Sequence, residues 1–185
     1  MSISLVFFII LFAALCHASW SAIVKKSRNS LAIMAITSII EIIVFLPLVF
    51  FVPFPTVDIW YFLIATTILH GFYRYSVIAS YNYADLSFVY PIARGGSCFI
   101  IGVISLFLLS NNISFFGTIG ILVTCLGLFM ISFMSAKKFN QKGFLLAILT
   151  AVLIATYTII DGIGVRNTEN AFTYIFWMLL LNGIP

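Results

Sequence analysis

The chain alternates between long apolar runs and short breaks of polar or charged residues. A helix of about 20 apolar residues, rising 1.5 Å per residue, is long enough to cross the hydrocarbon core of a bilayer. The pattern therefore predicts six full transmembrane helices, over Ile3–Val24, Ser30–Val52, Ile59–Tyr81, Leu86–Leu109, Ile113–Met134 and Gly143–Asp161.

A seventh apolar run begins near Thr173 and continues to Pro185. As a helix it would span roughly 20 Å, against a hydrocarbon core of about 30 Å. We therefore expect a truncated seventh helix, in a chain that is part of a longer protein.

Composition agrees with a chain whose solvent is largely lipid. It is 63% hydrophobic and 8% charged, with a mean hydropathy of +1.22. Soluble domains carry about a quarter charged residues, so a soluble fold is excluded and an all-α integral membrane protein is predicted. The net charge is +4, and most of the basic residues lie in short clusters between the apolar runs, where they set topology and give no reason to expect a nucleic-acid partner.

Basic residues gather in two of the loops. One cluster follows the first span and the other follows the fifth, so both lie on the same side of the membrane. The positive-inside rule places them in the cytoplasm and the N-terminus outside; only Arg166, after the sixth span, argues for the reverse. The clusters are Lys25, Lys26 and Arg28, and Lys137, Lys138 and Lys142.

Two short segments suggest an internal repeat. "ASWSAI" (Ala18–Ile23) and "ATYTII" (Ala155–Ile160) share one pattern at an offset of 137 residues. The offset spans five helices, an odd number, so the second copy enters the membrane from the opposite side, as in many secondary transporters. The prediction is a first repeat over residues 1–136, with helices one to five, and the start of a second over 137–185.

Three ionisable residues fall deep inside predicted spans: Glu41, Arg74 and Arg94. Charges at this depth are costly and are kept where they meet a partner or a wet cavity. One interpretation is a polar cavity for an anionic or zwitterionic solute, because the arginine fork binds carboxylate or phosphate through two hydrogen bonds. The other is an ion pair between Glu41 and an arginine that fixes helix packing.

Other side chains near these charges are candidate solute contacts. His70 shares a helical face with Arg74, where it could relay protons or simply bond a neighbouring helix. Tyr73 and Tyr90 lie near the arginines and could stack on a ligand or pack in the core, and Trp20 joins them as a candidate. Pro91 removes a backbone donor and predicts a kink just before Arg94.

Several segments resemble the EamA-type members of the drug/metabolite transporter superfamily. These are "ADLSFVYPIARG", "LLAILTAVLIATYTIIDGIGVR" and "HASWSAIVKK". The resemblance implies ten helices in two inverted five-helix halves, packed as a basket around a central cavity, in the bacterial inner (cytoplasmic) membrane. It also implies export or exchange of small metabolites such as amino acids.

The chain departs from that family at two places. Relatives often have proline shortly after the arginine-glycine pair, where Ser97 and Cys98 stand here. Many have a Gly-Glu pair after the fourth span, where this chain has "SNN" at 110–112. Family members are often drawn with cytoplasmic termini, whereas the charges here favour an external N-terminus.

The function predicted from these features is secondary-active transport by alternating access. Arg94 and Arg74 would hold the anionic group of the solute. Glu41 would balance their positive charge or couple transport to an ion, and the aromatic side chains would shape the pocket. An ion gradient, with the proton as a candidate coupling ion, or antiport would supply the energy, since no phosphate-binding Gly-Lys-Ser/Thr loop is present. No cofactor or metal is expected.

Two rival classes stay open. An intramembrane enzyme is poorly supported, because the sequence has no His-Glu-x-x-His or Gly-x-Ser-x-Gly motif, and the prediction is that the chain is not an enzyme. A non-transporting assembly subunit would fit a dry ion pair among the three membrane charges. A half-basket could also be completed by a second copy in a homodimer.

Overall fold

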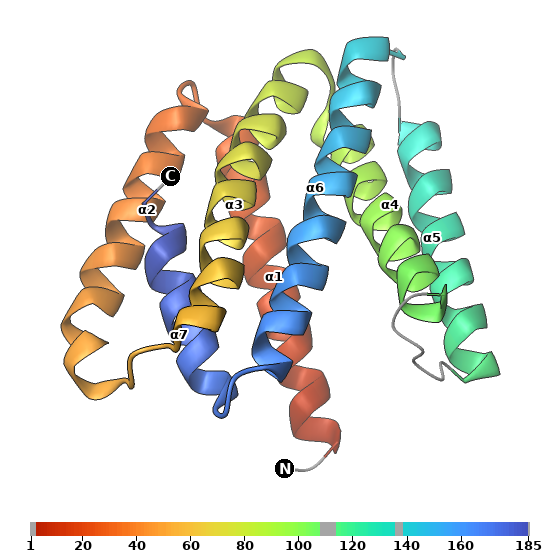
Figure 1. The fold of residues 1–185 in the computed structure, drawn as a ribbon. Coiled ribbons are helices and arrows are strands. Elements are labelled where there is room, and N and C mark those ends of the chain that lie inside the picture. The colour runs from red at the N-terminus through yellow and green to blue at the C-terminus, as the bar shows by residue number, and fades with distance from the viewer. Residues whose placement is uncertain (1–2, 108–113, 136–138, 185) are drawn as a thin grey trace.

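The computed structural model describes residues 3–107, 114–135 and 139–184, and every regular element in them is a helix (Figure 1). Six of the helices are long and apolar enough to cross a membrane, which agrees with a multi-pass membrane protein. The elements are α1 (Ile3–Lys26), α2 (Ser30–Phe45), a 3-10 helix η1 (Leu46–Phe51), α3 (Val57–Tyr83), α4 (Leu86–Phe107), α5 (Phe115–Ser135), α6 (Gln141–Arg166) and the shorter α7 (Ala171–Asn182).

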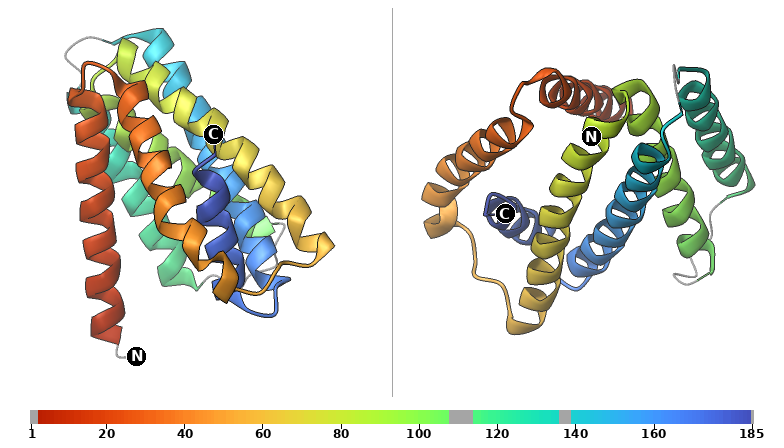
Figure 2. Two further views of the ribbon diagram at one scale, coloured as in Figure 1. Left: turned by 90° about the vertical axis from the view of Figure 1, so that its left-hand side faces the viewer. Right: turned by 90° about the horizontal axis from the view of Figure 1, so that it is seen from above.

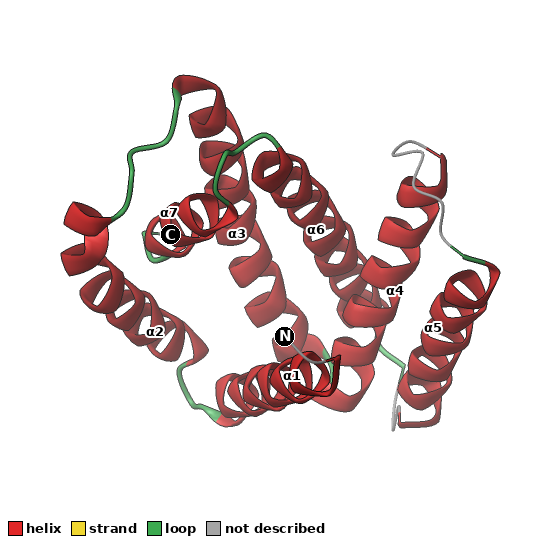
Figure 3. Ribbon diagram, turned by 90° about the horizontal axis from the view of Figure 1, so that it is seen from below, coloured by secondary structure: helices red, strands yellow, loops and turns green. Residues whose placement is uncertain are grey.

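The long helices run alternately up and down, but neighbours in sequence are not always neighbours in space. Helix α6 packs against both α3 and α4, while α5 covers the outer side of α4. Helix α7 packs against α2 and α3, and Figures 2 and 3 show it enclosed between them. The N-terminal half of α1 is exposed on all sides, as expected of apolar side chains that face lipid.

Asparagine side chains start three of the helices. Oδ1 of Asn29 accepts the backbone N–H of Ala32, and Oδ1 of Asn140 accepts that of Gly143, both at 3.1 Å. Asn170 does the same for Phe172 at 2.9 Å. Each cap satisfies a backbone donor that has no partner within its own helix.

Two predicted spans have the right position but the wrong internal structure or length. The second run is interrupted at Phe45, where the backbone changes to the 3-10 helix because Pro47 cannot continue the α-helical ladder. The sixth run is helical beyond Asp161 as far as Arg166. Asp161 therefore lies inside a membrane helix, whereas the sequence prediction placed it at a helix end.

The break between the third and fourth spans is confirmed at Ala84 and Asp85. The two helices do not form a closely packed hairpin, however, because α6 lies between them along most of their length (Figure 3). Helix α4 continues through Pro91 as one helix. The predicted end of the fourth span at Leu109 and start of the fifth at Ile113 lie outside the described residues.

The described basic residues in or beside the loops after α1 and α5 lie at the same end of the bundle, as predicted. The loops after α1, α3 and α5 meet at one end of the bundle (Figure 1), which places Lys25, Lys26 and Arg28 at the same end as Lys142. Arg166 ends α6 at the other end. Lys137 and Lys138 lie outside the described residues.

Small residues allow α6 to approach the end of α3 closely. A Cβ added at Gly143 would lie 2.6 Å from the Cβ of Ala84 and 3.4 Å from two backbone atoms, whereas one added at Gly127 would meet nothing within 4 Å. Gly143 therefore has a packing role that Gly127, on the exposed face of α5, does not have in this structure.

We expect Gly143→Ala to lower the free energy of unfolding by about 1–2 kcal/mol. A Cβ–Cβ distance of 2.6 Å is a severe clash, so the overpacking cost should be about 2–3 kcal/mol, which exceeds the gain in helix propensity of about 1 kcal/mol. Gly127→Ala, with the same chemistry and no clash, is expected to be neutral or stabilising. Thermal unfolding of both purified variants in one detergent checks this, and equal melting temperatures would contradict it.

Candidate functional site

An open cavity of about 320 Å³ lies among five helices of the bundle. Most of the side chains around it are polar or aromatic, although they come from strongly apolar helices. They are His17 and Trp20 of α1, Thr37 and Glu41 of α2, His70, Tyr73 and Arg74 of α3, Tyr157 of α6, and Met178, Leu179 and Asn182 of α7.

Arg74 and Glu41 form an ion pair at the edge of this cavity. Nη2 of Arg74 lies 2.9 Å from Oε2 of Glu41, and the two side chains are 13% and 28% exposed. Nη1 of Arg74 also donates to the hydroxyl of Ser38. The pair joins α2 to α3, and the charge of Arg74 is thereby compensated.

Arg94 has different surroundings. Its guanidinium bonds Nε2 of His17 and lies 5.7 Å from the centre of the Tyr90 ring. Within residues 3–107, 114–135 and 139–184 it forms no ion pair with a carboxylate. Arg94 is therefore a half-buried cation whose charge has no direct counterion in the described structure.

The predicted site residues fall into two adjacent groups. Glu41, Arg74, His70, Tyr73 and Trp20 line the open cavity. Arg94 and Tyr90 line a much narrower space of about 10 Å³ beside it. The groups are joined because Tyr73 borders both spaces, and because His17 of the cavity wall bonds Arg94.

Aromatic rings form one wall of the cavity. The ring centres of His70 and Tyr157 are 4.0 Å apart, and those of Tyr73 and Tyr157 are 5.6 Å apart. His17 also stacks on Trp20 at 5.7 Å. Trp20 and Tyr157 hold matching positions in the similar segments "ASWSAI" and "ATYTII", so each segment contributes an aromatic ring to the cavity.

Sequence reasoning did not identify three polar residues of this region: His17 as a cavity residue, Asn182 and Asp161. Asn182 is 6% exposed, and its Oδ1 has no hydrogen-bond partner among the described residues. Buried amide oxygens are seldom left without a donor, so this atom is a candidate contact for a ligand or a water molecule. Asn182 reaches the cavity because α7 packs beside it. Hydropathy along the sequence does not reveal this packing.

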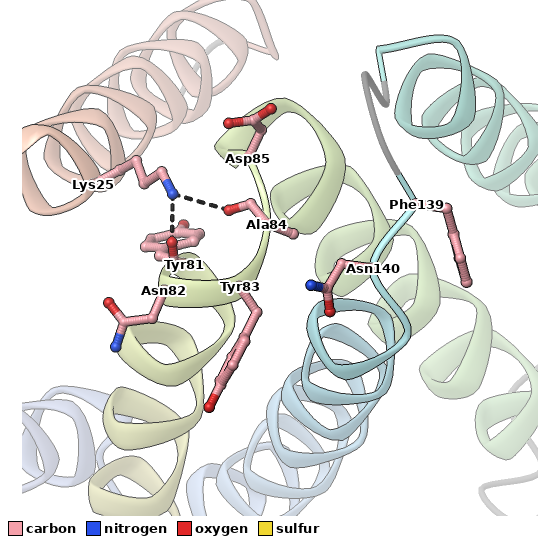
Figure 4. Close-up of a pocket in the computed structure, with 8 residues that line it drawn as sticks. All are labelled: Lys25, Tyr81, Asn82, Tyr83, Ala84, Asp85, Phe139 and Asn140. Atoms are coloured by element: carbon pink, nitrogen blue, oxygen red, sulfur yellow. Dashed lines mark hydrogen bonds between the residues drawn. The ribbon is translucent and has the colours of Figure 1, made fainter.

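A second hollow, of about 370 Å³, lies at the end of the bundle where the α3–α4 and α5–α6 loops meet (Figure 4). Lys25 reaches into it and is already engaged: Nζ donates to the carbonyl of Tyr81 and, at 2.9 Å, to that of Ala84. These carbonyls end α3, where a cation is favourable. Lys25 therefore caps α3, and the cavity in the membrane is the better candidate for a solute site.

Lys25→Met is expected to lower the free energy of unfolding by about 1–2 kcal/mol, because two carbonyls lose a charged donor. Lys26→Met is the matched control, since it removes the same charge from the same loop and affects topology equally. The melting temperatures of the two variants, compared in the same detergent, check this. Equal losses would show that Lys25 acts only through its charge.

No group of three or more His, Cys, Asp or Glu side chains in the described part of the chain is arranged to hold a metal ion. Comparison of the sequence with protein-family models and with curated proteins, and of the structure with solved structures, gives no match. Function is therefore inferred from the cavity and its charges.

Proposed function

We propose that this chain belongs to a secondary-active membrane transporter that moves small anionic or zwitterionic metabolites, such as amino acids, by alternating access. The observation that carries the proposal is Arg94, a membrane cation without a described counterion, next to a polar and aromatic cavity. Such a charge is expensive in a bilayer and is kept where it meets a partner or a ligand. An anionic solute would provide that partner.

An acidic amino acid such as L-aspartate carries two groups that match this arrangement. Its side-chain carboxylate suits the planar guanidinium of Arg94, which has no carboxylate partner in the described structure. An ammonium group suits the unpartnered Oδ1 of Asn182. Arg94 lies beside the cavity and not in its wall, so a solute in the cavity reaches it when His17 turns aside. Such a rearrangement is expected of a protein that alternates between two states.

The resemblance to EamA-type transporters supports the same function and adds expectations about the whole protein. These are a ten-helix basket of two inverted halves, in the bacterial inner membrane, working as an exporter or exchanger. The antiparallel directions of α1 and α6, which carry the repeated motif, agree with an inverted repeat (Figure 1). In this arrangement further helices, or a second copy of the chain, would complete the cavity.

A non-transporting assembly subunit is the second candidate, and the Arg74–Glu41 pair is the observation in its favour. A purely structural pair would satisfy both charges without any ligand. Two features favour transport over this alternative: the pair borders an open cavity, and Arg94 is not part of it.

Counterflow in proteoliposomes tests the proposal. Vesicles that contain purified protein are loaded with one unlabelled solute and diluted into the same solute in labelled form. The panel consists of the common amino acids and small carboxylates. A transporter accumulates label transiently in the absence of any other gradient, whereas protein-free vesicles do not. Failure with every member of the panel would favour the assembly subunit.

A further inference from the structure

Asp161 on helix α6 is a second carboxylate inside the membrane, in addition to Glu41. The proposed solute site does not use it. The hydroxyl of Tyr174 on α7 donates to its Oδ1 at 2.9 Å, and Tyr174 is fully buried. The contact depends on Gly164: a Cβ at that position would lie 2.4 Å from the Tyr174 ring. Close packing of α6 and α7 therefore holds the phenol against the carboxylate.

Helix α3 contributes two more groups to the surroundings of Asp161. His70 and Thr66 both interact electrostatically with the carboxylate, and Thr66 is fully buried. Nδ1 of His70 lies 2.9 Å from the backbone carbonyl of Thr66 and 3.2 Å from its hydroxyl. A carbonyl can only accept, so we assign the proton of the neutral imidazole to Nδ1. The Thr66 hydroxyl is then left to donate towards Asp161.

The cluster is connected to the solute cavity through His70. His70 lines the cavity, and its ring lies against Tyr157, which also interacts electrostatically with Asp161 and with Arg94 of α4. Arg74 and Glu41 also interact electrostatically with His70. The titratable and charged groups around Asp161 are thus His70 from α3, Tyr174 from α7 and Tyr157 on α6 itself.

The charges in this part of the membrane are balanced only when Asp161 is ionised. Arg74 and Glu41 cancel as a pair, and ionised Asp161 offsets the charge of Arg94. When Asp161 takes up a proton from water and becomes a neutral acid, the region gains one net positive charge. Electrostatic interactions are strong where water is scarce, so the added positive charge raises the electrostatic potential in the neighbouring cavity.

We infer that Asp161 is a proton-binding site whose protonation favours binding of an anionic solute in the neighbouring cavity, so that proton and solute bind together. The coupling to solute rests on the proposed transport function; the proton site itself does not. Linkage is reciprocal, so bound anion must also strengthen proton binding by the same factor. The coupling predicts movement of proton and anion in the same direction. This agrees with an exchanger and not with an exporter driven by an inward proton gradient, which would need proton and anion to move in opposite directions.

Infrared difference spectroscopy tests the proton site without any solute. Purified protein in lipid is titrated with acid, and the carbonyl stretching band of a protonated carboxylic acid is followed. We expect a band that is lost in Asp161→Asn and kept in Glu169→Gln, which removes an exposed carboxyl group from the α6–α7 turn. A full set of wild-type bands in folded Asp161→Asn would overturn the inference.

A second variant decides the question if Asp161→Asn fails to fold. Tyr174→Phe keeps the carboxyl group but removes the phenol that donates to it. One carboxylic-acid band of the wild type is then expected to titrate at a measurably different pH, because a donor to the charged form is lost. An unchanged titration in Tyr174→Phe would contradict a proton site at this position.

Coupling is measured with L-aspartate as the probe, in weakly buffered suspensions of the purified protein. Wild type is expected to take up protons when L-aspartate binds, and Asp161→Asn to bind L-aspartate without proton uptake. Equal proton uptake by both proteins would overturn the coupling. If no member of the counterflow panel is transported but the infrared band behaves as expected, the proposed function fails and the proton site stands.

Discussion

Arg74→Gln is expected to lower the free energy of unfolding by about 2–3 kcal/mol and to abolish counterflow of every solute. The substitution leaves Glu41 as an unpaired carboxylate among apolar helices, and breaking a fully buried pair costs roughly 3–5 kcal/mol. The smaller value applies here because the Glu41 side chain is 28% exposed. Unfolding in detergent, followed by circular dichroism, gives the stability, and the proteoliposome assay gives the activity.

The double variant Arg74→Gln, Glu41→Gln separates the two consequences. Two neutral amides of similar size can bond each other, so stability should return to within about 1 kcal/mol of wild type. Counterflow is expected to stay lost if the pair is part of the solute site. Full recovery of counterflow in the double variant would show that the pair is only a packing element.

Arg94→Gln is expected to have the opposite effect on stability. Removing a cation that lacks a described counterion relieves its desolvation, so the melting temperature should be unchanged or higher. Counterflow of anionic solutes should fall by roughly 10- to 100-fold, since a charge-assisted bond contributes about 1.5–3 kcal/mol. This combination of a stable protein and lost transport is the signature of a ligand-binding charge.

Arg94→Lys is the matched control for this variant. It keeps the positive charge but loses the planar fork, so partial activity is expected if the solute is held through two parallel hydrogen bonds. A large loss of stability in Arg94→Gln, comparable with that of Arg74→Gln, would instead place Arg94 among the packing residues.

The positions of the helices could be predicted from the sequence because hydropathy and span length are local properties. The break at Ala84 and Asp85 is an example, since two apolar runs are separated there by a few polar residues. The predicted end of the sixth span, at Asp161, is wrong because it also rests on a local signal. A charged residue is the local sign of a span end, but α6 continues past Asp161 to Arg166, with Asn167 as its C-cap.

The partners of the membrane charges depend on how distant helices are arranged, and no local pattern encodes that. The short break between spans three and four gives no sign that another helix lies between them. Because α6 lies between α3 and α4, Arg74 meets Glu41 of α2, while Arg94 meets His17 of α1. The sequence singled out the charged residues but left open which of them is paired.

The most direct test compares L-aspartate with L-asparagine, which are nearly identical in shape and differ in one negative charge. The ratio of their initial counterflow rates is measured in proteoliposomes with wild type and with Arg94→Gln. If Arg94 attracts the anionic solute, the ratio of the L-aspartate rate to the L-asparagine rate is expected to be at least about tenfold lower in Arg94→Gln, because each 1.4 kcal/mol of lost interaction is a factor of ten. An unchanged ratio in an active Arg94→Gln protein would contradict the central role of Arg94.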